Sequence, residues 1–585
     1  MKGHNALHPC RFCEILGIRI EGGNIHYVPL YRPEGSIDPA NLPMRSHDKF
    51  LKQGASVLEA PTNAAAERLA KDSGIKGVSL LASLNTLNFP FSFPLDFMHL
   101  IFENLIPNLV RHYTGTFKEL DSGVEDYKLS GEVWSEICKA GSETGDTIPS
   151  SFGSRMPNIE TERSHMTAEA WAFWSMYLAP ILLRNRFSRR RYYDHFIKLV
   201  RLIHTCISFE LKRSEVEGIR KGFQEWVLEY EEIFYQKNLS RMSACPVTIH
   251  GLLHIADGIE ATGPVWAAWA FVMERYCGWV KRSAVRSRKH ALTSIDNRVL
   301  ETTQLEMAKM RYGLTKKLSL KPKRGRTSKV KFSNYPEYAM LDPKRTLAVD
   351  AALTRQLIDL IVTRCSPDSV DRKIPAAVAR KYVPRQLTEW GGVQIHDTGD
   401  RANGRAHRKP ESSTRDSCFV RYECLIDRNA DNKGPEDLIQ ETFFGELQRV
   451  VQLDLPKSSE LHLYQDETIV LAHIRTCNAI KNDDGFWEYT SMNHSPHFVD
   501  LKTIACVVGR VRDRGCWAFV DRSGPTAHAK MASPPSSQCS DVTGFSTSDE
   551  SDSSPGSLSE GSLTSGSSPA NANGSPMDLD TSSSE

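Results

Sequence analysis

Two pairs of metal-binding residue types, far apart in the chain, constrain the fold more than any other feature. Cys10 and Cys13 form a CxxC motif, and His250 and His254 stand four residues apart. On an α-helix that spacing puts both imidazoles on one face, one turn apart, where they can bind the same metal ion. Either pair alone is weak evidence, because a tetrahedral thiolate–imidazole site needs both halves. Together they supply a complete Cys2His2 set.

Two other interpretations of these residues remain. A CxxC motif can be a redox pair, but that needs a thioredoxin-type βαβ context, and none is predicted here. Alternatively, the histidines are hydrogen-bonded core residues and the cysteines incidental. His4, His8, His99 and Cys245 are further candidates for the ligand set.

The composition places the chain in a broad class. At 585 residues it is too long for one core, so two or three domains are expected. The 13 cysteines lack the dense spacing of a disulfide framework, which favours reduced, intracellular thiols. The N-terminus has no apolar core typical of a signal peptide, and the apolar stretch Ala170–Leu183 is too short to span a bilayer. We expect a soluble nuclear protein without a membrane partner.

Hydrophobic periodicity predicts a largely helical first half. Helices are expected at 60–76, from Asp96, and at 166–183, 192–211, 215–234 and 295–312. Residues 114–165 are polar and rich in Gly and Ser, and we expect a variable excursion there.

The pattern changes in the second half of the chain. Helices are predicted at 349–365 and 375–382, followed by six short strands between Ser417 and Ser523, typical of a small β-barrel or sandwich. The predicted organisation is a zinc-linked region at 1–315, a basic linker with helices at 316–410, a β-rich domain at 411–525 and a disordered, Ser-rich acidic tail at 526–585.

Basic residues gather in three runs, although the net charge is only +2. These are Arg184–Arg191, Lys281–Lys289 and Lys316–Lys331. Such runs are often solvated faces or linkers, but they also suit DNA phosphates or nuclear localisation. The candidate DNA-binding residues of the first two runs are Arg184, Arg186, Arg189, Arg190, Arg191, Lys281, Arg282, Arg286, Arg288 and Lys289.

Two acidic residues are candidates for chemistry. Glu274 lies in the apolar segment WAAWAFVMERYCG, where a buried carboxylate needs a cation, a metal or a hydrogen-bond donor. Asp96 and His99 are three residues apart on one helical face. The simplest interpretation of that pair is an acid at a helix N-terminus beside a hydrogen-bonded histidine.

Three segments carry a resemblance to a known family. MKGHNALHPCRFCEI, LDFMHLIFENL and PVTIHGLLHIADGIEATGPVWAAWAFVMERYCG resemble, in order and wording, the transposases of CACTA (En/Spm-type) DNA elements, especially fungal versions. The resemblance covers roughly Met1–Leu314, and the β-rich part resembles the downstream region of the same proteins.

The resemblance implies an α/β fold, with a partial RNase H-like (DDE transposase) core and an all-helical insertion that contacts DNA. Cys10, Cys13, His250 and His254 would bind one structural zinc that joins the insertion to the core. Glu274 would be the last carboxylate of the DDE triad.

The family's two triad aspartates belong upstream of CxxC, and only nine residues precede Cys10 here. We therefore expect both to be absent, with Asp96 as the only substitute. A complete triad would bind two Mg²⁺ or Mn²⁺ ions for phosphodiester cleavage.

The leading hypothesis is a transposase-derived protein that binds DNA but is catalytically incomplete. One alternative is a domesticated nuclear DNA or chromatin adaptor. Another is an active nuclease that uses Asp96, His99, Asp257 and Glu274. A homo-oligomer is compatible with each of them, and no small-molecule substrate is expected.

Overall fold

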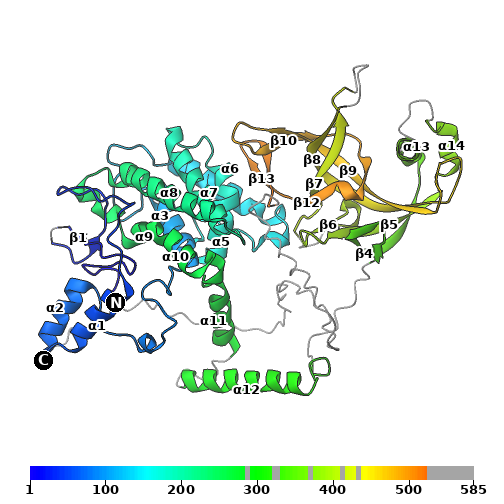
Figure 1. Cartoon of the computed structure of the whole chain (residues 1–585). Coiled ribbons are helices and arrows are strands. Elements are labelled where there is room, and N and C mark those ends of the chain that lie inside the picture. The colour runs from blue at the N-terminus through cyan, green and yellow to red at the C-terminus, as the bar shows by residue number, and fades with distance from the viewer. Residues whose placement is uncertain are drawn as a thin grey trace, which may run out of the picture. The chain divides into compact units, whose positions relative to one another are not determined.

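The computed structural model describes residues 1–20, 22–283, 290–318, 330–366, 373–408, 415–429 and 437–522, which belong to one unit, Met1–Met531 (Figure 1). Some predictions fall outside these residues. They concern the acidic tail 526–585, most of the run Lys316–Lys331, and Arg286, Arg288 and Lys289.

The N-terminal segment is held against its own first helices. It contains an antiparallel strand pair, β1 (Ile18–Arg19) and β2 (His26–Tyr27), then α1 (His47–Leu58) and α2 (Asn63–Ser73). Helix α2 ends at Gly74, whose φ is 77° and whose N–H donates to Ala70 O. An added Cβ at Gly74 would lie 2.6 Å from His8 O, so the close approach of the N-terminal segment requires glycine here.

A helical region follows, with a core that contains the buried Trp174 and Trp226. The predicted helices are present, and three of them contain a π-helical segment, namely η2 (Met98–Leu105), η6 (Trp174–Leu178) and η7 (Glu231–Tyr235). The α-helices of this region are α3 (Ile106–Tyr113), α4 (Gly131–Ser142), α5 (Ala168–Phe173), α6 (Ala179–Leu182), α7 (Arg190–Cys206) and α8 (Arg213–Tyr230). Helices α7 and α8 pack against each other.

Helix α4 lies in the stretch that was expected to be a polar excursion. Ser130 caps its first turn by accepting a hydrogen bond from Val133 N. Trp134, Ile137 and Cys138 are buried in the helical core at helical spacing. The expectation was wrong because a high Gly and Ser content in this stretch concealed a short apolar stripe.

The segment with the two histidines forms α9 (Val247–Gly251), the 3₁₀ turn η9 (Leu252–His254) and α10 (Ile255–Thr262). Two further helices follow, α11 (Phe271–Ser283) and α12 (Ala291–Arg311). No residue of α12 is buried against the described part of the chain.

The second half contains one antiparallel sheet of 12 strands, with the order β13-β14-β10-β9-β8-β5-β4-β3 and side branches. The strands are β3 (Val330–Phe332), β4 (Tyr335–Ala348), β5 (Gln386–Ile395), β6 (Arg401–Asn403), β7 (Phe419–Asp427), β8 (Leu438–Leu455), β9 (Glu467–Lys481), β10 (Trp487–Met492), β11 (His497–Asp500), β12 (Ile504–Val507), β13 (Gly509–Asp513) and β14 (Cys516–Val520). A small β-barrel or sandwich was predicted, and among the described strands the pairing does not close into a barrel.

The sheet also begins earlier than expected. Strands β3 to β6 lie within 330–403, a stretch predicted as linker and helices, yet they belong to the same sheet, because β5 pairs with β8 of the predicted β-rich domain. The two predicted helices are present as α13 (Ala351–Cys365) and α14 (Ala376–Lys381) (Figure 1). Their buried side chains share a core with Leu453 and Leu471 of the sheet. Mixed α and β structure is thus confirmed, in a larger sheet than the sequence predicted.

Candidate metal centre

The two cysteines of the predicted site lie in a tight, buried turn. The Sγ of Cys10 accepts a hydrogen bond from Phe12 N at 3.3 Å. Arg45 Nε lies 3.2 Å from each of the Cys10 and Cys13 carbonyl oxygens and donates to them. Cys10 is 5% exposed and Cys13 is fully buried. The turn therefore presents both sulfur atoms to the protein interior.

The two histidines meet this turn from the other side. His250 Nε2 lies 3.1 Å from Cys13 Sγ and 3.2 Å from His254 Nε2. The four ligand atoms of Cys10, Cys13, His250 and His254 all lie within 4.8 Å of one another, and all four residues are buried. In a tetrahedral zinc site, Zn–N bonds of about 2.0–2.1 Å place two nitrogen ligands about 3.3 Å apart. The prediction that these residues converge is confirmed, and their donor atoms fit zinc.

A second layer of contacts orients one of the imidazoles. His254 Nδ1 is 2.9 Å from Asp257 Oδ2, and the other carboxylate oxygen of Asp257 pairs with Arg220. Arg220 also pairs with Glu260 at 2.8 Å. The ring of Phe12 stacks on that of His254, with 5.2 Å between centroids. A carboxylate on the far nitrogen of a histidine is the usual partner of a metal-binding imidazole.

Without a metal, protonation is uneven across the cluster: Cys10 favours its charged form, whereas Cys13 and His254 hold protons that a bound metal would displace. Burial raises the pKa of the Cys10 thiol, but the hydrogen bond with Cys13 and the charges of the histidines outweigh burial and hold that pKa well below its usual value. The hydrogen bond to Cys10, together with burial, raises the pKa of Cys13. Burial lowers the pKa of His254, yet Cys10 and Asp257 raise it to about 9. A thiolate is therefore favoured inside this buried cluster, and thiolate is the form that binds zinc.

The structure brings the acidic candidates Asp96 and Glu274 to the same histidine. Asp96 Oδ1 accepts from Ala270 N at 2.7 Å, and Asp96 Oδ2 pairs with His99 Nδ1. On the other side of the ring, His99 Nε2 lies 3.5 Å from Glu103 Oε2 and 4.0 Å from Glu274 Oε1. Burial lowers the pKa of His99, but the three carboxylates raise it above its ordinary value. The three acids thus favour the protonated form of the His99 ring.

Two features of the candidate catalytic set differ from expectation. The Glu274 side chain is 56% exposed, so the apolar sequence around it does not bury its charge. Asp257, which the nuclease hypothesis grouped with Asp96, contacts His254 and Arg220 instead. Among the described residues, the Cys2His2 cluster is the one group of three or more His, Cys, Asp or Glu side chains whose ligand atoms lie close enough together to hold a metal ion.

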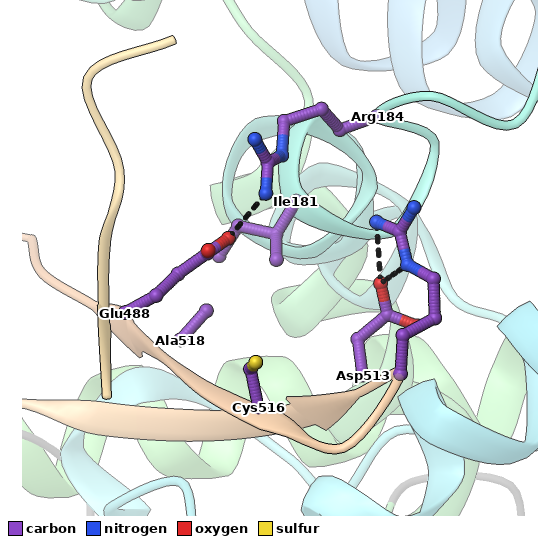
Figure 2. A pocket seen from close by; sticks show the side chains of 7 residues that line it. Ile181, Arg184, Glu488, Asp513, Cys516 and Ala518 are labelled. Atoms are coloured by element: carbon purple, nitrogen blue, oxygen red, sulfur yellow. Dashed lines mark hydrogen bonds and ion pairs between the residues drawn. The ribbon is translucent and has the colours of Figure 1, made fainter. Parts of the chain in front are cut away.

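The arginines of the first basic run pair with carboxylates of the same chain. Arg184 Nη2 lies 2.6 Å from Glu488 Oε1, beside a cavity of about 240 Å³ (Figure 2). Arg186 Nη2 lies 2.9 Å from Asp513 Oδ1, and both side chains are less than a tenth exposed. These two arginines join the helical region to strands β10 and β13.

The remaining arginines of this run are more exposed. Arg190 pairs with Asp194 at 2.7 Å and with Asp484, whereas Arg189 and Arg191 lie 3.9 and 3.6 Å from Glu125. In the second run, Lys281 and Arg282 are exposed at the end of α11. DNA contact by either run stays a prediction.

Comparison with models of known protein families gives no match, and comparisons with curated proteins and with solved structures give none either. Within the described ranges, no helix is both long and apolar enough to cross a membrane.

Proposed function

We propose that this chain derives from a transposase of the CACTA type, and that it is a DNA-binding protein whose helical region is stabilised by structural zinc. The observation that carries the proposal is the buried cluster of Cys10, Cys13, His250 and His254, assembled from two distant segments. Four protein ligands leave no open position for a substrate or an attacking water, so a zinc ion here is structural.

The surroundings of Glu274 support its assignment to an RNase H-like core. Helix α11 exposes apolar side chains, with Val272 60%, Met273 59% and Tyr276 46% exposed. An apolar helix face of this kind normally packs on another element. In the described parts of residues 1–318 the strands are confined to the short pair β1–β2. The exposed apolar face of α11 is therefore of the kind that packs on a sheet in a protein core, and no such sheet lies in the described parts of residues 1–318.

The local chemistry favours binding over cleavage. Phosphodiester transfer needs two divalent ions about 3.5–4 Å apart, held by several carboxylates. In this chain, Asp96 and Glu274 lie on opposite sides of His99, whose charged form they stabilise. The ring of His99 occupies the space between the two carboxylates, and its protonated form, which they favour, would repel a metal cation. We propose that the described residues do not cut DNA.

Elemental analysis combined with a binding assay tests the function. The purified chain should contain one zinc and bind labelled duplex DNA with an affinity that falls steeply with salt, because binding to phosphates releases counterions. Cys13→Ser should lose the zinc. Cys138→Ser is the matched control, since Cys138 is also buried and reduced but lies in the helical core, outside the ligand cluster. Folded protein without zinc, or an affinity unchanged by salt, would contradict the proposal.

A further inference from the structure

Around β8, buried carboxylates pair with arginines that are more exposed to solvent. Three carboxylates form the inner layer, with side chains only 5–6% exposed: Glu389, Asp416 and Glu446. The arginines that pair with them are more exposed, reaching 45% at Arg405 and 39% at Arg475. Negative charge thus lies beneath positive charge.

Asp416 is the centre of one half of this arrangement. Its Oδ2 lies 3.2 Å from Arg408 Nη1, 3.1 Å from Arg510 Nη2 and 3.7 Å from Arg405 Nη1. Arg405 also reaches Glu446, with 3.4 Å between Nε and Oε1. One guanidinium therefore joins two buried carboxylates, which fixes its orientation.

The other half lies on neighbouring strands. Arg475 Nη2 is 2.9 Å from Glu446 Oε2, and these residues are opposite each other on β9 and β8. Arg449 Nη1 is 2.7 Å from Glu389 Oε1. Each of these pairs leaves further N–H groups of a 34–39% exposed arginine available, because a guanidinium has five.

The turn that contains Arg405 packs closely against the sheet. This turn, η12 (Arg405–His407), follows Gly404 and packs on β8. An added Cβ at Gly404 would lie 3.2 Å from Gln448 O and 3.6 Å from Arg449 Cα. The backbone of the turn therefore lies against the strand that carries Arg449.

We propose that Arg405, Arg449 and Arg475, here called the arginine face, bind the phosphate backbone of duplex nucleic acid. Four arginines, Arg405, Arg449, Arg475 and Arg510, share the three buried carboxylates, which leaves one positive charge in this group. Guanidinium groups fixed by a buried acid can donate to phosphate oxygens with little loss of side-chain freedom. The proposal rests on the DNA-binding function above, but it moves the contact to a surface that the basic runs do not include.

Fluorescence anisotropy of a labelled 20-base-pair DNA duplex with the full chain, over a series of salt concentrations, tests this assignment. The double variant Arg405→Gln and Arg475→Gln should lower the affinity about tenfold at low salt and reduce the slope of log K against log salt by about 1.8, or about 0.9 for each lost phosphate contact. Arg364→Gln is the matched control. Its side chain is 33% exposed, and it pairs with two carboxylates of its own, Glu467 and Asp500, whereas the carboxylates of the arginine face are shared among several arginines.

Two outcomes would overturn the assignment. In one, the double variant melts like the parent chain and keeps the parent affinity and slope. In the other, a polyglutamate peptide of equal charge competes as well as DNA, which would indicate an acidic protein partner. Lys281→Gln with Arg282→Gln, measured alongside, separates the two proposals. If that variant alone lowers the slope, the chain binds DNA and the arginine face does not.

Discussion

Asp257 accepts a hydrogen bond from the imidazole of His254, with 2.9 Å between Oδ2 and Nδ1. This bond holds Nε2 of His254 toward the other ligand atoms of the metal centre. Since Asp257 also pairs with Arg220 of α8, the orientation of one ligand depends on the packing of the helical core. The contacts from His254 through Asp257 to Arg220 therefore connect the candidate metal centre to the helical core.

Asp257→Asn should weaken zinc binding without abolishing it. A partner of a metal-bound histidine typically contributes about 10- to 100-fold in affinity. Competition with a coloured zinc chelator measures this directly. Glu260→Gln is the control, because Glu260 pairs with Arg220 but has no contact with His254. Equal affinities of the Asp257→Asn variant and the parent would show that packing alone orients the ring.

Removal of zinc should destabilise the helical region. Without the metal, the cluster leaves two thiols and two imidazoles buried with incomplete partners, and metal-binding energy in such sites contributes directly to folding. A strong chelator should therefore lower the melting temperature of the parent chain. The Cys13→Ser variant should already melt at the lower temperature and should not respond to the chelator. A parent melting curve unchanged by the chelator would argue that packing, and not metal, closes this site.

The stability of the helical core should depend on pH through His195. Its ring stacks on Trp226 and donates from Nε2 to Trp226 O at 3.2 Å, while Trp226 Nε1 donates to His195 O at 3.0 Å. Burial lowers the pKa of His195 to about 4. Between that value and an unfolded pKa of about 6.5, the unfolded chain binds the proton and the folded chain does not. Stability present above pH 6.5 is therefore lost as the pH falls, by up to about 3 kcal/mol.

Other groups also contribute to the pH dependence of stability. The test therefore compares how much the free energy of unfolding changes with pH in the parent and in a His195 variant. Denaturant unfolding of the parent and of His195→Gln at pH 7.5 and pH 5 isolates the contribution of His195. The variant should lose less stability than the parent on acidification. If both lose the same amount, the proton is not excluded from His195 in the folded chain.

Breaking the pair of Arg186 and Asp513 should loosen the sheet from the helical region. Both side chains are less than a tenth exposed, and removing one partner of a buried ion pair typically costs about 3–5 kcal/mol. Arg186→Gln should therefore increase protease cleavage near β13. Arg189→Gln provides the comparison, because Arg189 is 59% exposed and lies 3.9 Å from its partner. Similar cleavage of the two variants would contradict a role for Arg186 in joining the regions.

The chain as given should not cleave DNA in Mg²⁺ or Mn²⁺. Glu274→Gln should accordingly change no reaction, and it should lower the pKa of His99 by removing one of the three carboxylates that raise it. Plasmid nicking assays and NMR titration of the His99 ring measure these two outcomes. Metal-dependent nicking that disappears in both Asp96→Asn and Glu274→Gln would show that these acids form an active site.

The Cys2His2 cluster could be predicted from sequence because its signals are local. Cys10 and Cys13 are fixed by a short motif, and His250 and His254 by one helical turn. Asp257 lies three residues after His254, on the same helical face, so the sequence also indicates a carboxylate that could hydrogen-bond to this histidine. A local pattern could not show that the histidine turn is partly 3₁₀, since packing against the cysteine turn decides that geometry.

Long-range pairing explains what the sequence did not predict. The charge of Arg184 and Arg186 is visible in the sequence, but their partners Glu488 and Asp513 are about 300 residues away. Strand β4 was missed because Pro343 and the basic residues after it break the alternation of apolar and polar positions. Glu274 was expected to be buried because its neighbours are apolar, whereas their exposure depends on which element covers α11.

The position of the four ligands along the chain has a consequence for synthesis. A ribosome releases Cys10 and Cys13 long before His250 and His254, so a nascent chain carries half of the site while most of the helical region is being made. Domains commonly fold as units during translation, and closing so long a loop is slow. All four ligands become available only after the turn Leu252–His254 has emerged. Zinc retention would then report that synthesis had passed His254. A chain interrupted before that residue would carry two cysteines without their histidine partners, and these thiols would be exposed to oxidation.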